Sequence, residues 1–326
     1  MSEERMNETM NQNVTPVFSG GGVPQYGQMP NEQQPEKASV AKKIGQFFLA
    51  LSPIVACVAL QLLVVIAVMV VIVIIALVEE LAVNPNLMQD MDAYMAFVMD
   101  VYLENASAGV LAYHIVGTIV FGIWYYFSFK KPRPKVLSSF KKLNVKNLVI
   151  TVLSGVLLCF FANGTVCIES VVLPKMVENY MEMAEIAGLG VNPLAIFSAI
   201  ILAPIGEEFV CRGLAQKFAK KCFGKFWIAN IFQALMFGLI HMNWVQGIYA
   251  FVIGLVLGWL VERYDSIVPA MILHCVVNFS TSTWVGYVLT PVPMNLVSGL
   301  ILTIVPMLLI GALIFWAGKK PQVQAA

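Results

Sequence analysis

The sequence predicts an all-α, polytopic integral membrane protein with about eight transmembrane helices. Of its 326 residues, 59% are hydrophobic and only 12% are charged, whereas about a quarter of the residues of a soluble domain carry charge. Apolar runs recur along the whole chain, and most reach the ~20 residues that a helix needs to cross a bilayer. The net charge of +1, with Lys and Arg in short patches between these runs, gives no reason to expect a nucleic-acid partner.

The expected helices follow one another from residue 47 to residue 317. The first run is longer than one crossing requires, so this helix is expected to tilt or to project from the bilayer. The sixth run is the shortest. In chain order, the expected spans are 47–78, 107–129, 147–170, 194–216, 226–243, 246–262, 266–288 and 296–317.

The positions of Lys and Arg predict the orientation of these helices. Three lysines precede the first run, and residues 44–129 contain neither Lys nor Arg. The segment 130–146 is strongly basic, and basic residues recur in every second connection after it. Because cytoplasmic loops are enriched in Lys and Arg, we expect a multi-pass protein of the cell membrane with both termini in the cytoplasm.

Composition divides the chain into three regions. Residues 1–43 are rich in Gly, Pro, Asn and Gln and contain no apolar stretch like that of a signal peptide, so they are expected to form a disordered cytoplasmic tail. Residues 44–146 are expected to hold the first two transmembrane helices and the basic inner loop. Residues 147–320 form the core, which carries most of the intramembrane polar residues.

Several polar side chains interrupt the apolar runs. A charged residue at the centre of a membrane helix costs roughly 2.5–3.5 kcal/mol on insertion scales, so such residues usually have a function. His114 has only Thr118 as a polar neighbour on its helix, and packing is the favoured interpretation for it. For Glu208 and Arg212 on their own, a structural ion pair is the favoured interpretation. Four further polar groups come from three separate helices, which is too many for packing alone: Glu207, His241, His274 and Asn278.

Helical spacing separates the two acids. Glu208 and Arg212 stand at i and i+4 with the acid first, the better order for an ion pair. Glu207 points about 100° away, because a helix has 3.6 residues per turn. Arg212 can therefore neutralise Glu208 while Glu207 remains available for another role. His274 and Asn278 are likewise at i and i+4 and project in the same direction.

These residue types suit hydrolysis. A carboxylate and an imidazole that face one cavity can hold and deprotonate a water molecule, and a second His with an Asn amide can donate hydrogen bonds to a developing oxyanion. One Glu and two His are also zinc-ligand types, but the HExxH spacing is absent, and no serine stands in a GxSxG context. Pro204 and Gly206 are expected to weaken the helix just before the acids.

Three short segments resemble the motifs of the CAAX protease and bacteriocin-processing family. "EEFVCR" (207–212) matches EExxxR, "FGLIH" (237–241) matches FxxxH, and "HCVVN" (274–278) matches HxxxN/D. The order of the three is also that of the family, and the likeness covers about residues 194–283. Membership would make residues 147–320 an α-helical intramembrane endopeptidase core.

The resemblance also implies roles for the matched residues. Glu207 would act as general base and activate water together with His241. His274 and Asn278 would form the oxyanion site, and Glu208 with Arg212 would brace the helix. A metal-free mechanism is expected, with zinc as the open alternative.

The expected partners are the lipid bilayer and a membrane-associated peptide or protein substrate, of the CAAX type or like a bacteriocin. Two other functions stay open. A non-catalytic membrane scaffold or bacteriocin-immunity protein could keep the same fold, and a proton-coupled transporter could use the same buried acids.

Gly254 and Gly258 form a GxxxG pattern in "IGLVLGW". Small residues at this spacing let two membrane helices approach closely. We expect them to pack against a neighbouring helix of the same chain.

Overall fold

The computed structural model describes residues 40–128, 144–186 and 192–318. Within these ranges all regular secondary structure is helical, so the predicted all-α fold is confirmed. Residues from Val40 onward form one compact unit. Most of the expected tail, most of the basic loop at 130–146, and the two C-terminal lysines lie outside the described residues.

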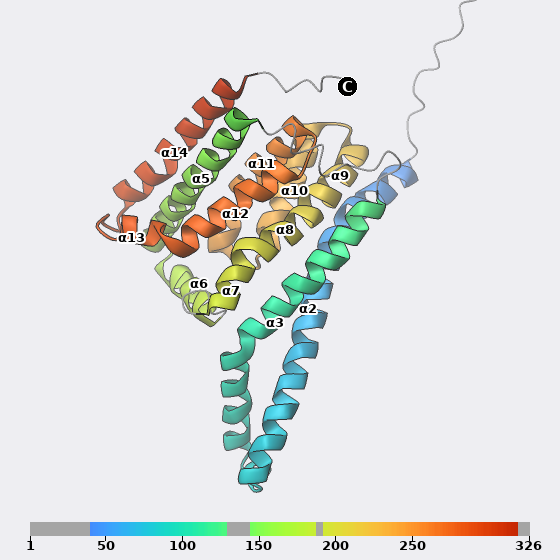
Figure 1. Cartoon of the computed structure of the whole chain (residues 1–326), viewed down its shortest axis with the longest axis vertical. Coiled ribbons are helices and arrows are strands. Elements are labelled where there is room, and N and C mark those ends of the chain that lie inside the picture. The colour runs from blue at the N-terminus through green and yellow to red at the C-terminus, as the bar shows by residue number, and fades with distance from the viewer. Residues whose placement is uncertain (1–39, 129–143, 187–191, 319–326) are drawn as a thin grey trace, which may run out of the picture. The chain divides into compact units, whose positions relative to one another are not determined.

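Figure 1 shows the order of the elements along the chain. The long helices are joined by short turns and by shorter helices. The elements are α2 (Val40–Val83), η1 (Leu87–Gln89), α3 (Met91–Phe127), α5 (Val145–Val172), α6 (Pro174–Ile186), α7 (Pro193–Phe197), η2 (Ser198–Leu202), α8 (Ala203–Glu208), η3 (Phe209–Ala215), α9 (Gln216–Phe223), α10 (Phe226–Leu239), α11 (Trp244–Tyr264), α12 (Val268–Thr283), α13 (Val285–Leu289) and α14 (Leu296–Ala317).

The protein is a polytopic membrane protein, but the expected count of eight spans is not confirmed. Six helices of the described residues are long and apolar enough to cross a membrane, with the continuous stretch Pro193–Phe223 counted as one. The other two expected spans are shorter. α10 has 14 residues and α12 has 16, which correspond to about 21 and 24 Å at 1.5 Å per residue. The helix α6 was not predicted.

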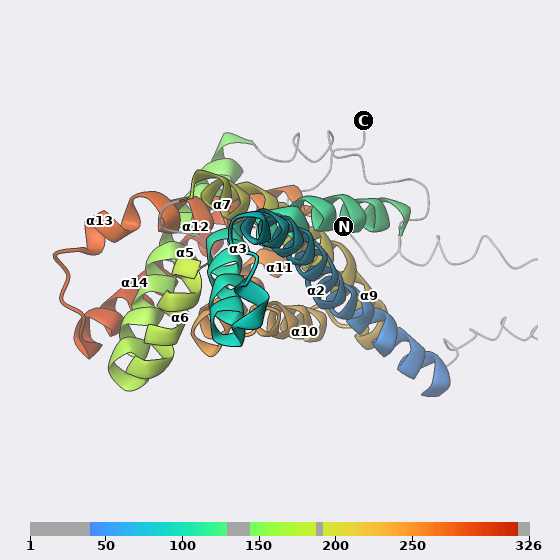
Figure 2. The ribbon, with the colours of Figure 1, turned by 90° about the horizontal axis from the view of Figure 1, so that it is seen from below.

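The first two membrane helices form a long hairpin. α2 has 44 residues, about 66 Å at 1.5 Å per residue, whereas the hydrocarbon core of a bilayer is about 30 Å thick. The first helix is therefore overlong, as the sequence indicates. α3 begins at Asp90, whose side chain caps the backbone N–H groups of Asp92 and Ala93. α2 and α3 then pack side by side (Figures 1 and 2).

The stretch Pro193–Phe223 positions the candidate site, and its middle is not regular α-helix. Two π-helical segments, η2 and η3, flank the short α8 that carries both acids. In η2 the N–H of Ala203 bonds the carbonyl of Ser198, five residues back. The next residue, Pro204, has no N–H to continue this ladder. The helix is therefore not broken at the weak point expected at Pro204, but changes from α-helical to π-helical hydrogen bonding around it. π-helical segments are frequent at functional sites.

Gly206 lets α3 approach α8 closely. A Cβ at this position would lie 3.0 Å from the hydroxyl oxygen of Thr118. The Thr118 hydroxyl donates to the carbonyl of Leu202 at 3.1 Å. α3 is thus fixed against the helix that carries the acids. α2, α3 and α9–α12 surround that helix, and the core of the unit lies among them.

Candidate active site

A buried charged cluster lies beneath the site. Glu208 and Arg212 are both fully buried, and Nη1 of Arg212 donates to Oε1 of Glu208 at 2.8 Å. The same carboxylate oxygen lies 3.0 Å from Nδ1 of His274, which is 66 residues further along the chain. An ionised carboxylate can only accept hydrogen bonds, so Nδ1 of His274 carries a proton. The ion pair has the i, i+4 geometry expected from the sequence.

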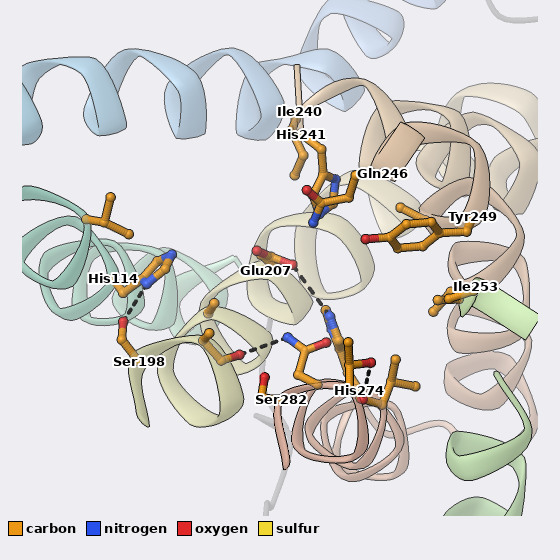
Figure 3. A pocket seen from close by; sticks show the side chains of 18 of the residues that line it. His114, Ser198, Glu207, Ile240, His241, Gln246, Tyr249, Ile253, His274 and Ser282 are labelled. Atoms are coloured by element: carbon orange, nitrogen blue, oxygen red, sulfur yellow. Dashed lines mark hydrogen bonds and ion pairs between the residues drawn. The ribbon is translucent and has the colours of Figure 1, made fainter. Parts of the chain in front are cut away.

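Glu207 faces the cavity and lies near only the His274 ring of this cluster. Its side chain is 21% exposed, and its Oε2 lies 3.7 Å from Nε2 of His274 (Figure 3). That distance is too long for a direct hydrogen bond. Among the described residues, no side chain or backbone group donates a hydrogen bond to Glu207. Its carboxylate is therefore free to hold water or substrate.

His241 lies outside the expected helix. The sequence places it within a span at 226–243, but α10 ends at Leu239, and His241 stands in the turn before α11, followed by Met242 with φ of 55°. Nδ1 of His241 lies 2.7 Å from the carbonyl oxygen of Phe237. A carbonyl only accepts, so Nδ1 donates, and the Nε2 of the neutral ring carries a lone pair. Figure 3 shows this ring on the same side of the cavity as Glu207.

Asn278 connects α12 to the π-helical segment before the acids. Its Nδ2 donates to the carbonyl of Ala199 at 2.8 Å. In the π register this carbonyl would pair with the nitrogen of Pro204, which has no hydrogen. Asn278 supplies the missing donor, and one of its two N–H groups is used in doing so. The second N–H remains for the oxyanion role expected of this residue.

Phe237, the first residue of the FxxxH pattern, has a structural role that the sequence did not indicate. Its ring is 2% exposed and lies 4.2 Å from the guanidinium carbon of Arg212. It also meets the rings of His241 and His274 edge to face, at centroid distances of 5.0 and 5.5 Å. Phe237 thereby separates the two imidazoles and covers the buried charge.

One cavity of about 460 Å³ contains all four predicted reacting residues on its wall. The structure thus brings together Glu207, His241, His274 and Asn278, whose catalytic roles stay predictions. The buried pair Glu208 and Arg212 does not line it. Other polar side chains on the wall that were not predicted include Gln61, Asn163, Tyr180, Ser198, Gln246, Tyr249, Thr281 and Ser282.

His114 also lines this cavity, although its sequence context favours a packing role. Its Nδ1 lies 2.6 Å from the hydroxyl oxygen of Ser198. Ser198 is 84 residues away in the chain, and spacing along one helix could not reveal such a partner. The one available signal was that His114 is one of only three histidines in the chain, and the other two belong to the motifs.

A metal centre was the open alternative at this site. Among the described residues, no three His, Cys, Asp or Glu side chains lie close enough together to hold a metal ion.

Residues 190–280 match a family model described as type II CAAX prenyl endopeptidase Rce1-like. This match supports the resemblance to the CAAX protease and bacteriocin-processing family and covers less than half of the chain. No curated protein and no solved structure matches the chain. The family segment runs from just before α7 to α12 and includes every residue of the three motifs. The cavity extends beyond it, because α2, α3, α5 and α6 also contribute to the wall.

Proposed function

We propose that the protein is an intramembrane endopeptidase that hydrolyses a peptide bond of a membrane-associated substrate with a water molecule activated by Glu207 and His241. The observation that carries this proposal is the free carboxylate of Glu207. It faces a cavity among the helices and lies beside two imidazoles whose Nδ1 atoms are both engaged. The family described for residues 190–280 is one of proteases, which supports the same reaction class.

The chemistry needs only groups that the cavity wall provides. A water molecule between Glu207 and Nε2 of His241 can lose a proton to the carboxylate as its oxygen attacks the carbonyl carbon of the substrate. The carbonyl oxygen becomes an oxyanion, which hydrogen-bond donors must stabilise. When the C–N bond breaks, Glu207 returns the proton to the nitrogen of the leaving amine. The products are a carboxylic acid and an amine.

The buried cluster would keep the site in order. Arg212 pairs with the buried carboxylate of Glu208, and Glu208 fixes the proton of His274 on Nδ1. An imidazole ring whose Nδ1 is held by a hydrogen-bond partner keeps one orientation and one tautomer. Glu208 and Arg212 therefore act through His274 and do not touch the substrate.

The substrate class follows from the family description. A prenylated peptide that ends in a CAAX sequence is the first candidate, which the family description supports. A bacteriocin-like peptide is the second, which the resemblance of the three motifs suggests. Both would reach the cavity from the membrane. We place the protein in the cell membrane with both termini in the cytoplasm, because Lys42 and Lys43 precede the first helix and the following 86 residues lack Lys and Arg.

The proposal is tested with the purified protein in detergent micelles. A farnesylated CAAX peptide and a panel of unmodified membrane peptides are incubated with wild type and with Glu207→Gln, and the products are identified by mass spectrometry. Wild type is expected to cleave at one bond. Glu207→Gln is expected to lose about 10²–10⁴-fold in rate, the usual contribution of a general base, while its melting temperature stays near that of wild type.

Two results would redirect the interpretation. If Glu207→Gln cleaves as fast as wild type, the carboxylate is not the base. If neither protein cleaves any peptide, and Glu207→Ala keeps the cellular phenotype of the wild type, a scaffold or immunity role replaces the peptidase.

A further inference from the structure

His114 and Ser198 form a polar pair on the wall of the cavity that Glu207 also lines. His114 lies on α3, outside the family segment, and Ser198 is the first residue of η2. Their side chains are 2.6 Å apart, and Ser198 is only 1% exposed. Figure 3 shows the other nitrogen of the His114 ring directed toward the side of the cavity where Glu207 lies.

The partner of each histidine determines which nitrogen carries the proton. His241 and His274 place Nδ1 against a carbonyl and a carboxylate, which only accept hydrogen bonds. In both neutral rings, Nε2 therefore carries a lone pair. His114 differs, because its Nδ1 meets a hydroxyl group, which can donate.

The hydroxyl of Ser198 has one acceptor to donate to. Among the described residues, the His114 ring is its hydrogen-bond partner. No hydrogen bond joins this hydroxyl to the carbonyl one turn back in the helix, that of Leu194, which accepts the backbone N–H of Ser198. Both groups are satisfied when the hydroxyl donates to Nδ1. The neutral His114 ring then carries its proton on Nε2 and presents an N–H group to the cavity.

The proposed hydrolysis requires such a donor. An oxyanion forms next to Glu207. His241 offers no N–H at Nε2 while its ring is neutral, and His274 offers one there only when its ring carries both protons. Asn278 keeps a single N–H after donating the other to Ala199. A neutral imidazole N–H adds a donor without adding another charge to a buried site, which would be costly.

We propose that His114 is a substrate-binding residue whose neutral ring donates its Nε2–H to a carbonyl oxygen of the peptide, with Ser198 fixing the tautomer. The inference rests on the proposed function for its role, but the tautomer can be tested without any substrate. The proposal places His114, a residue of the hairpin formed by α2 and α3, in contact with the peptide.

The tautomer is tested by nitrogen NMR of the full chain labelled with ¹⁵N-histidine. The chain has three histidines, so the spectrum contains three rings, and each is assigned from the spectrum of the variant that lacks it. We expect His114 to be protonated at Nε2 and both other rings at Nδ1. In Ser198→Ala the His114 ring is expected to lose this preference. A His114 ring protonated at Nδ1 in wild type overturns the proposal, whether or not the protein cleaves peptides.

The role is tested by cleavage of the farnesylated CAAX peptide, or of the panel peptide that wild type cleaves fastest. His114→Leu is expected to lower kcat by about 10²-fold, the effect of removing one oxyanion donor. His114→Gln keeps an N–H donor at a similar reach and is expected to recover most of the loss. Thr118→Val is the matched control, because it breaks another hydrogen bond between α3 and the helix of the acids without lining the cavity.

The outcomes are distinct. If Glu207→Gln is inactive and His114→Leu equals wild type, the His114 proposal fails and the proposed function stands. If Thr118→Val loses as much activity as His114→Leu, the loss reflects the packing of α3, and the proposal also fails. If Glu207→Gln equals wild type, the proposed function itself fails.

Discussion

Two regions of the molecule bury polar side chains within apolar helices, and they do so in different ways. In the first, the charged cluster of Glu208, Arg212 and His274 lies directly beneath the cavity. In the second, between α10 and α11, Gln233 donates to Asn230 at 2.8 Å and to the carbonyl of Gly254 at 2.9 Å. Asn230 in turn donates to the carbonyl of Leu255 at 3.0 Å.

The difference shows what makes a buried polar group informative. The amides of the second region are neutral, and they fasten two helices by bonding to backbone carbonyls, which is a packing role. Neither Asn230 nor Gln233 lines the cavity. The first region is charged. Its imidazole, that of His274, presents Nε2 to the cavity near the carboxylate of Glu207, which accepts no hydrogen bond from the described residues. Polarity in a membrane helix therefore suggests function only where unengaged atoms face an enclosed space.

The largest effect on stability is expected from Arg212→Met. This change leaves Glu208 fully buried without its cation, and breaking a buried ion pair costs about 3–5 kcal/mol. The free energy of unfolding in mixed micelles measures it. Lys220→Met is the control, because the pair of Lys220 with Glu262 is 40% and 33% exposed, and surface pairs contribute about 0–1 kcal/mol. Equal losses of unfolding free energy for the two variants would mean that the buried ion pair contributes no more to stability than the exposed one.

A smaller effect is expected from Gly258→Ala in the second region. The new Cβ would overlap Oδ1 of Asn230 and lie 2.6 Å from Nε2 of Gln233. Such overpacking costs about 1–3 kcal/mol, and the specific activity of the folded protein should not change. Gly311→Ala in α14 is the control, since a Cβ there meets nothing within 4 Å and Ala favours a helix by about 1 kcal/mol. A loss of kcat in folded Gly258→Ala would contradict a pure packing role.

The smallest effect is expected from chelation. EDTA or phenanthroline should leave the cleavage rate unchanged, because the proposed mechanism uses Glu207 and His241 without a metal. The rate is measured before and after chelator treatment, with and without added zinc. Loss of activity that zinc restores would assign the Nε2 atoms of His241 and His274 to metal binding and reject the metal-free mechanism.

Short-range relations could be predicted from the sequence, and long-range ones could not. The pairing of Glu208 with Arg212 and the separate direction of Glu207 follow from helical geometry alone. The contact between His274 and Glu208 joins residues 66 positions apart, and that between His114 and Ser198 joins residues 84 apart. These contacts depend on how helices pack, which periodicity does not specify.

Local irregularities of the helices could also not be predicted from the sequence pattern. An apolar run shows no sign of where a helix ends, so His241 was placed inside a span when it stands in a turn. Pro204 indicated a weak point, but the two π-helical segments around α8 depend on neighbours such as Asn278 and Thr118 that supply the compensating hydrogen bonds.

The walls of the cavity come from both inside and outside the family segment. Residues 190–280 supply the carboxylate, both engaged imidazoles and the amide of Asn278, whereas Cys57, Tyr113, His114 and Tyr180 come from helices before it. In the proposed peptidase, the groups that activate water are thus encoded in the family segment, whereas part of the wall that a peptide would touch is encoded before it. Substitutions in α2, α3 and α6 would then reshape the cavity over evolution while Glu207, His241 and His274 stay in place.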